Sequence, residues 1–159
     1  MRAARRAATL AVLICLWAGS ALAVAVGDPA IPIEGEDLTG ERITLESYLG
    51  KKVILLKFGS IYCSTCASSL EDIARIQRKF SASDLQVVGV NLDVYGLARV
   101  RTFYRSYSSL IRYPMIIDGK LAASHPYNIE SIPAHVVIDK GGLISYISTG
   151  ATEEDLKTL

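Results

Sequence analysis

The feature that most constrains this chain is a pair of cysteines, Cys63 and Cys66, together with the segments on either side of it. The run 53–58 before the pair is apolar apart from one lysine, which is typical of a buried strand. After the pair, apolar residues recur every three to four positions from Ser64 to Phe80, which predicts an amphipathic helix. A buried strand that leads through a short loop into a helix favours an α/β fold.

Strand and helix patterns alternate along the rest of the chain, and 159 residues suit one domain. The turn Asp139–Gly142 separates two predicted strands and indicates a hairpin. We therefore expect an α/β sandwich with a mixed sheet. The further expected elements are strands at 42–45, 85–90, 113–117, 134–138 and 143–148, a helix at 97–107, a brief helix at 121–124 that Pro126 stops, and a short final helix from Thr152.

The N-terminus has the pattern of a secretory signal peptide. Three arginines in the first six positions precede an apolar run from Ala7 to Val26, and Ala21-Leu22-Ala23 resembles a cleavage site. We expect cleavage after Ala23, which leaves residues 24–159 as the mature domain. A retained membrane anchor is the alternative, because about 18 apolar residues can span a bilayer.

Charge and cysteine content exclude several classes of function. Removal of residues 1–23 takes away three of the 17 basic residues, so 14 remain against 16 acidic ones and the net charge is −2. This balance does not favour binding to nucleic acid or to an anionic membrane. The remaining cysteines close too short a loop to stabilise a fold, and a zinc site would need two further ligands, for which only His125 and His135 are candidates. A redox role is therefore preferred over a metal site or an inert pair, and no cofactor is expected.

The position of each cysteine predicts its role. The start of a helix offers unpaired N–H groups and the positive end of the helix dipole, which stabilise a thiolate. We expect Cys63, at that start, to be the nucleophile. Cys66, one turn further in, is better shielded and would resolve the mixed disulfide.

The stretch Val53–Cys66 resembles the active-site segment of the thioredoxin superfamily, and more narrowly that of the exported TlpA-like and ResA-like thiol–disulfide oxidoreductases. Four further places are similar to that group, and together they cover roughly residues 33–159: 37–51, 87–91, 127–133 and 136–142. The resemblance implies a thioredoxin-like fold over residues 24–159, with helices that flank a mixed central sheet and an N-terminal β-hairpin extension.

The resemblance also implies functions for residues outside the cysteine pair. It makes Pro133 a cis-proline that faces the disulfide, and it places Tyr62, Ile132 and Pro133 in the surface that binds substrate. Ile132 is apolar and donates nothing to a thiolate, which favours a reductase. The sequence departs from the group at Ser64-Thr65, where a proline usually precedes the second cysteine, and at Ser69, where ResA-like proteins carry a glutamate.

Lys57 stands six residues before Cys63, where thioredoxins place a buried acid. Either its stem is packed while the ammonium reaches water, or the cation lies near the sulfurs and lowers the pKa of a cysteine. The first alternative is the preferred one. We expect His135 to lie on an exposed face of its strand.

The expected function is that of an exported thiol–disulfide oxidoreductase that reduces protein disulfides. The resemblance suggests a task such as cytochrome c maturation, with electrons from a membrane-embedded thiol donor. The protein would be a periplasmic monomer, either soluble or tethered by an uncleaved N-terminal segment. Two alternatives use the same fold: a peroxiredoxin-type peroxidase, for which Leu56 and Ser60 give half of the expected motif, and a Sco-like copper-delivery protein, because thiolates suit Cu(I).

Overall fold

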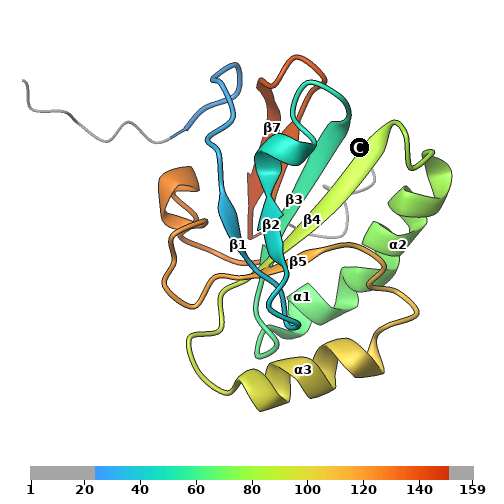
Figure 1. Ribbon diagram of the computed structural model, residues 1–159, viewed down its shortest axis with the longest axis vertical. Helices are drawn as coiled ribbons and strands as arrows, with labels where there is room; N and C mark the ends of the chain where they lie inside the picture. The colour runs from blue at the N-terminus through green and yellow to red at the C-terminus, as the bar shows by residue number, and fades with distance from the viewer. Residues whose placement is uncertain (1–23, 151–159) are drawn as a thin grey trace, which may run out of the picture.

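The computed structural model describes residues 24–150, and at its centre is a five-stranded sheet in the order β5-β4-β3-β6-β7 (Figure 1). The central strand β3 runs parallel to β4 and antiparallel to β6, which confirms the expected mixed sheet. The bounds of these strands are β3 Val53–Gly59, β4 Leu85–Asn91, β5 Met115–Ile117, β6 Ala134–Ile138 and β7 Ile144–Thr149.

Both faces of the sheet are covered. From β3 the chain passes through α1 (Ser64–Ser68) and α2 (Leu70–Lys79) to β4, and then through α3 (Leu97–Ser106) to β5. Right-handed crossovers in one direction along the sheet place their helices on the same face. A buried cluster on that face joins Leu55 and Val87 of the sheet to Ile73 of α2, and Tyr104 of α3 packs against it.

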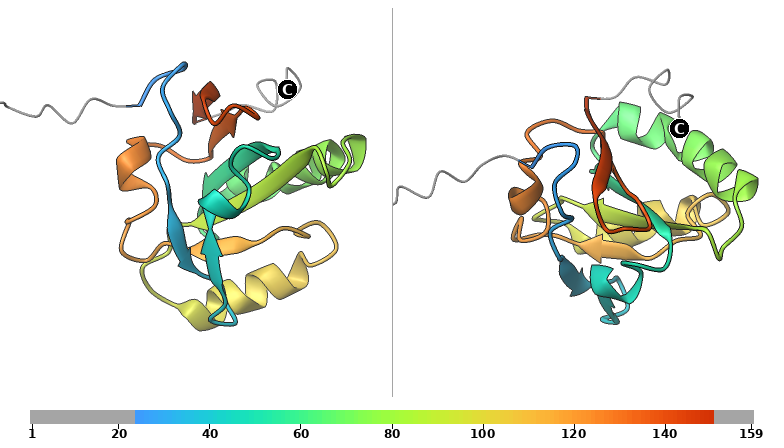
Figure 2. Two further views of the ribbon diagram at one scale, coloured as in Figure 1. Left: turned by 45° about the horizontal axis from the view of Figure 1, so that its top comes forward. Right: turned by 90° about the horizontal axis from the view of Figure 1, so that it is seen from above.

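The opposite face packs against the N-terminal segment and the turn before β6. There β1 (Glu34–Glu36) and β2 (Arg42–Thr44) form an antiparallel hairpin, followed by the 3-10 helix η1 (Leu45–Ser47). Gly35 lies so close to Ile116 of β5 that a Cβ at this position would overlap its side chain. The expected N-terminal hairpin is therefore present, on the side of the molecule opposite α2 (Figure 2).

Two predicted helices differ from the structure. The helix predicted from Ser64 to Phe80 is divided at Ser69, whose hydroxyl donates to the backbone oxygen of Cys66 at 2.9 Å. The brief helix predicted at 121–124 is instead η2 (His125–Tyr127), and Pro126 lies inside it rather than stopping it. Proline is tolerated there because the N–H groups of a first helical turn have no partner within the helix.

No helix among residues 24–150 is long and apolar enough to span a membrane. The predicted signal peptide or anchor and the predicted final helix lie outside the described residues.

Candidate active site

The cysteine loop follows the central strand β3, at the end of the sheet where β3 and β4 terminate and β6 begins. We call this end the edge of the sheet. β3 ends at Gly59, whose backbone oxygen accepts from the N–H of Leu92 at 2.9 Å, just beyond the end of β4. On the other side Phe58 pairs with Ala134, the first residue of β6. The loop 60–63, the segment after β4 and the approach to β6 therefore meet at this edge, the usual place for sites in α/β folds.

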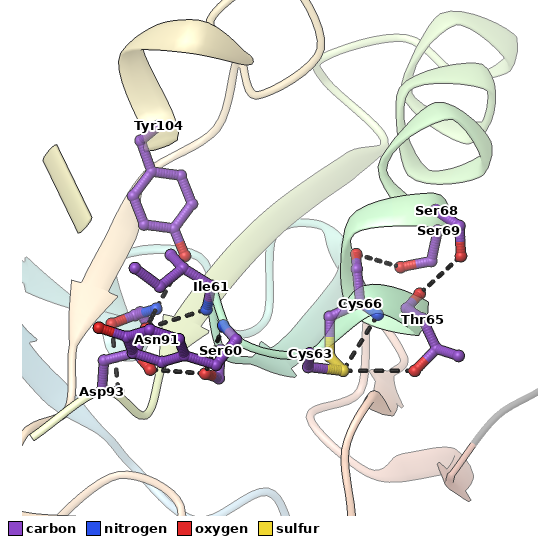
Figure 3. The surroundings of a disulfide bond; sticks show 11 residues. Ser60, Ile61, Cys63, Thr65, Cys66, Ser68, Ser69, Asn91, Asp93 and Tyr104 are labelled. Carbon is purple, nitrogen blue, oxygen red and sulfur yellow. Dashed lines mark hydrogen bonds between the residues drawn. A yellow bond between two sulfur atoms is a disulfide. The ribbon is translucent and has the colours of Figure 1, made fainter. Parts of the chain in front are cut away.

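Cys63 and Cys66 form a disulfide at the start of α1, with Cα atoms 5.2 Å apart (Figure 3). Cys63 is the N-cap of α1, and its Sγ accepts a hydrogen bond from the N–H of Cys66 at 3.1 Å. Its Sγ also lies 3.3 Å from the Thr65 hydroxyl oxygen. Cys63 is half-buried, whereas Cys66 is only 3% exposed. Both donors near Cys63 would stabilise its thiolate in the reduced protein.

The Ile132–Pro133 bond is cis, as the resemblance implies. Pro133 immediately precedes β6, and Ala134 pairs with Phe58, so the proline lies at the same edge as the cysteine loop. The backbone oxygen of Pro133 accepts from the N–H of Gly150 at 2.8 Å, which fixes the approach to the strand. Ile132 is half-buried, and Tyr62, next to Cys63, is 64% exposed.

Lys57 is buried within the molecule, so the preferred expectation that its ammonium reaches water is wrong. The residue is 7% exposed, and burial lowers the pKa of its amine from 10.5 to about 8. Its Nζ lies 3.3 Å, and the Cys66 Sγ 3.4 Å, from the point that a Cβ on Gly59 would occupy, so the two atoms are less than about 7 Å apart. Lysine and cysteine line the same small cavity, about 10 Å³ in volume, which Phe103 and Tyr104 of α3 also line.

The expectation of an exposed His135 is also wrong, because this side chain is completely buried. His135 pairs with Lys57 across β3 and β6. Directly opposed residues share a face of the sheet, so the histidine lies on the same covered face as the lysine.

A buried carboxylate that the sequence reasoning did not identify holds the cysteine loop. Asp93, just after β4, accepts from the Ser60 hydroxyl, from the N–H of Ile61 at 3.0 Å and from the Asn91 side-chain amide at 2.7 Å (Figure 3). Asn91 also donates to the Tyr104 hydroxyl at 3.1 Å. Burial is the main reason that the pKa of Tyr104 is raised to about 12, with the neighbouring charge of Asp93 adding to it. Polar residues directly after two neighbouring parallel strands were the available signal.

The described residues contain no group of three or more His, Cys, Asp or Glu side chains that could hold a metal ion.

A disulfide at the start of a helix, directly after the central strand of a mixed sheet, defines a thioredoxin-like disulfide protein. The model of the AhpC/TSA family matches residues 26–147, and the chain belongs to this family. It is 29% identical to the thiol-disulfide oxidoreductase ResA of Halalkalibacterium halodurans, over 82% of this chain and 72% of the relative. It is 31% identical to the thioredoxin-like protein YneN of Bacillus subtilis, over 78% and 71% of the two chains.

Solved structures agree with this assignment. The exposed lipoprotein thioredoxin Etrx1 of Streptococcus pneumoniae superposes with a TM-score of 0.67 at 27% identity, covering 81% of this chain and all of that one. A DsbF homologue from Corynebacterium diphtheriae gives a TM-score of 0.70 at 26% identity, covering 83% and 84%. The thioredoxin-like fold and the ResA-like resemblance are thereby confirmed, and the protein is a thiol–disulfide oxidoreductase.

Proposed function

We propose that this protein reduces disulfide bonds in other proteins, with Cys63 as the nucleophile and Cys66 as the resolving cysteine. The observation that carries the assignment is the difference in exposure between the sulfurs: Cys63 is half-buried at the loop, and Cys66 is 3% exposed beneath it. A substrate can approach only the outer sulfur, and the inner one is placed to attack Cys63 once a mixed disulfide has formed.

The proposed reaction consists of two exchanges. The Cys63 thiolate attacks a substrate disulfide, forming a mixed disulfide and releasing one substrate thiolate, which takes up a proton. The Cys66 thiolate then attacks the Cys63 sulfur, which forms the Cys63–Cys66 disulfide and releases the second substrate thiol. Two electrons pass to the substrate, and a thiol donor must return the enzyme to its dithiol form.

Tyr62, Ile132 and Pro133 are the proposed substrate-binding residues. Tyr62 belongs to the cysteine loop, and Ile132 and Pro133 immediately precede β6 at the same end of the sheet. Tyr62 offers an exposed ring beside Cys63. Ile132 brings no side-chain donor toward a thiolate, and a less stabilised thiolate gives a more reducing couple. This supports reduction as the direction of the reaction.

Lys57 is proposed to modulate the pKa of Cys66. Its amine and the Cys66 sulfur line one cavity and are less than about 7 Å apart. An opposite charge at short range favours a thiolate, particularly where water is excluded. Lys57 therefore acts through Cys66, as a positioning residue, rather than on the substrate.

The proposal extends to export, for which the N-terminal sequence pattern is the support. A periplasmic protein of this kind, soluble or tethered, would receive electrons from a membrane-embedded thiol donor. It would act as a monomer on protein disulfides, among them those handled during cytochrome c maturation. No cofactor is needed, because thiol–disulfide exchange involves only the sulfurs.

Reduction of insulin by the purified protein, with dithiothreitol as electron donor, tests the proposal. We expect Cys63→Ser to abolish catalysis and Cys66→Ser to accumulate mixed disulfides, with exposed Ser68→Ala as the matched control. Alkylation of Cys66 before Cys63 by a limiting reagent would reverse the assignment. Peroxide consumption or stoichiometric copper binding without insulin reduction would instead favour the peroxidase or copper-delivery alternative.

A further inference from the structure

Exposed apolar side chains are concentrated beside Cys63. Eight large apolar side chains are exposed among the described residues, and four of them lie in two adjacent segments. These four, which we call the aromatic patch, are Tyr62 at 64%, Val94 at 56%, Tyr95 at 84% and Leu97 at 48% exposed. Single exposed apolar residues are normal on protein surfaces, whereas a contiguous group beside a reactive centre indicates an interaction site.

The hydrogen bonds of the site explain why the two segments are adjacent. Asp93 accepts from the Ser60 hydroxyl and from the N–H of Ile61, so the base of the 94–97 segment is tied to the cysteine loop. At the other end of that segment, the Tyr62 hydroxyl lies 3.5 Å from the point that a Cβ on Gly96 would occupy. Gly96 has φ of +79° and is the N-cap of α3. The patch is therefore held in place rather than carried on a free loop.

The charge next to the patch is positive. The Cδ atom of Arg99 lies 4.0 Å from the same point above Gly96, so it is less than about 8 Å from the Tyr62 hydroxyl. From Val94 to Ser106 the chain carries three arginines and no acidic residue. Arg101 donates to the backbone oxygen of Leu38, whereas Arg99 is exposed and takes part in none of the ion pairs formed within residues 24–150.

We infer that the aromatic patch and Arg99 form a recognition surface for a polypeptide substrate that carries an apolar or aromatic residue near its reactive cysteine and an acidic residue beyond it. The inference rests on the proposed reduction of protein disulfides. The patch would bury the apolar residue while Cys63 attacks the neighbouring sulfur, and Arg99 would pair with the acid. Substrate choice thus resides in the segment after β4 as well as in the cysteine loop.

Synthetic peptides that each contain one disulfide test this surface. One carries Phe and Glu beside a cysteine, a second replaces Phe with Ser, and a third replaces Glu with Lys. A small non-peptide disulfide and insulin are measured in parallel. We expect kcat/KM to be about tenfold higher for the Phe peptide than for the Ser peptide, and about threefold higher with Glu than with Lys.

Variants of the aromatic patch and of Arg99 show which residues produce these peptide preferences. The double variant Tyr95→Ser, Leu97→Ser should lose the preference for Phe. Its kcat/KM should fall more for the Phe peptide than for the small disulfide. Arg99→Glu should invert the preference between Glu and Lys. Leu143→Ser is the control and should change neither ratio, because Leu143 is an apolar residue that is 42% exposed and lies at the opposite end of the sheet.

The outcomes separate the two proposals. Equal kcat/KM values for all three peptides, or preferences that survive in the double variant and in Arg99→Glu, would overturn the recognition surface while insulin reduction still stands. Failure of the native protein to reduce insulin and the small disulfide would instead overturn the proposed function. Circular dichroism of each variant establishes that a loss of preference does not come from misfolding.

Discussion

Replacement of Lys57 by Met should stabilise the oxidised protein at neutral pH. Met keeps most of the length of the stem and removes the charge, so packing changes little. Burial lowers the pKa of the Lys57 amine from 10.5 to about 8, which means that the folded protein holds this proton less tightly than the unfolded chain does. The charged lysine therefore opposes folding, and it does so fully at pH values below about 8.

The size of the effect follows from the pKa shift. Between pH 8 and 10.5 the unfolded chain binds more protons at Lys57 than the folded protein, so stability rises with pH over that window. At about 1.4 kcal/mol for each pKa unit, the charge opposes folding by about 3 kcal/mol at pH 7 and by about 1.5 kcal/mol at pH 9.5. The gain in the free energy of unfolding from Lys57→Met should therefore be smaller at pH 9.5 than at pH 7 by the difference between these two values. Any packing contribution is the same at both pH values.

Urea unfolding of the native protein and Lys57→Met at pH 7 and at pH 9.5 measures both values. The oxidised form is used so that neither cysteine titrates, and the other ionisable groups on this face, including Tyr104 and His135, are common to both proteins. Exposed Lys120→Met is the matched control and should show no such pH dependence. If the stability difference between the native protein and Lys57→Met is the same at the two pH values, the conclusion that a buried charge on Lys57 opposes folding is refuted.

Three further outcomes are expected. In the reduced protein, Lys57→Met should raise the pKa of Cys66 and slow the resolution of mixed disulfides near neutral pH, less so at higher pH; identical thiol titrations followed by absorbance would contradict this. Asp93→Ala should lower the free energy of unfolding by about 3 kcal/mol, because it leaves buried donors without their acceptor, and Asp93→Asn should cost less in the same urea titration. Ile132→Thr places a hydroxyl beside the cysteines and should make the couple less reducing against glutathione; an unchanged equilibrium constant would count against the proposed position.

The core of the fold could be predicted because its signals are local and strong. The apolar run 53–58 is typical of a buried strand, and the turn Asp139–Gly142 joins two strand-like runs with the residues that a hairpin turn requires. The division of the long helix at Ser69 was not predictable from periodicity. At this point the Ser69 hydroxyl donates to the Cys66 carbonyl, and the division leaves the apolar spacing of the sequence unchanged.

Burial of polar residues was predicted least well, and the reason is tertiary. Ala134, Val136 and Ile138 pack on one face of β6, so the alternation suggests that His135 faces water. Helices cover the other face as well, and a strand at the centre of a two-sided sheet has no exposed face. The same cover encloses Lys57, which is the residue paired with His135. Only the order of the strands and the side taken by each crossover reveal this.

The proximity of Lys57 to Cys66 explains why a charged side chain is buried at this position. Burial penalises each charged form alone: it lowers the pKa of the amine and raises that of a shielded thiol. When both groups share one cavity, transfer of the thiol proton to the neutral amine forms an ammonium and a thiolate together, so each charge is formed beside an opposite charge that stabilises it. Their titrations then belong to the pair rather than to either group. The ammonium opposes folding in the disulfide form, where it has no thiolate, and stabilises the resolving thiolate in the dithiol form. Reduction of the disulfide should therefore narrow the stability gap between the native protein and Lys57→Met at pH 7.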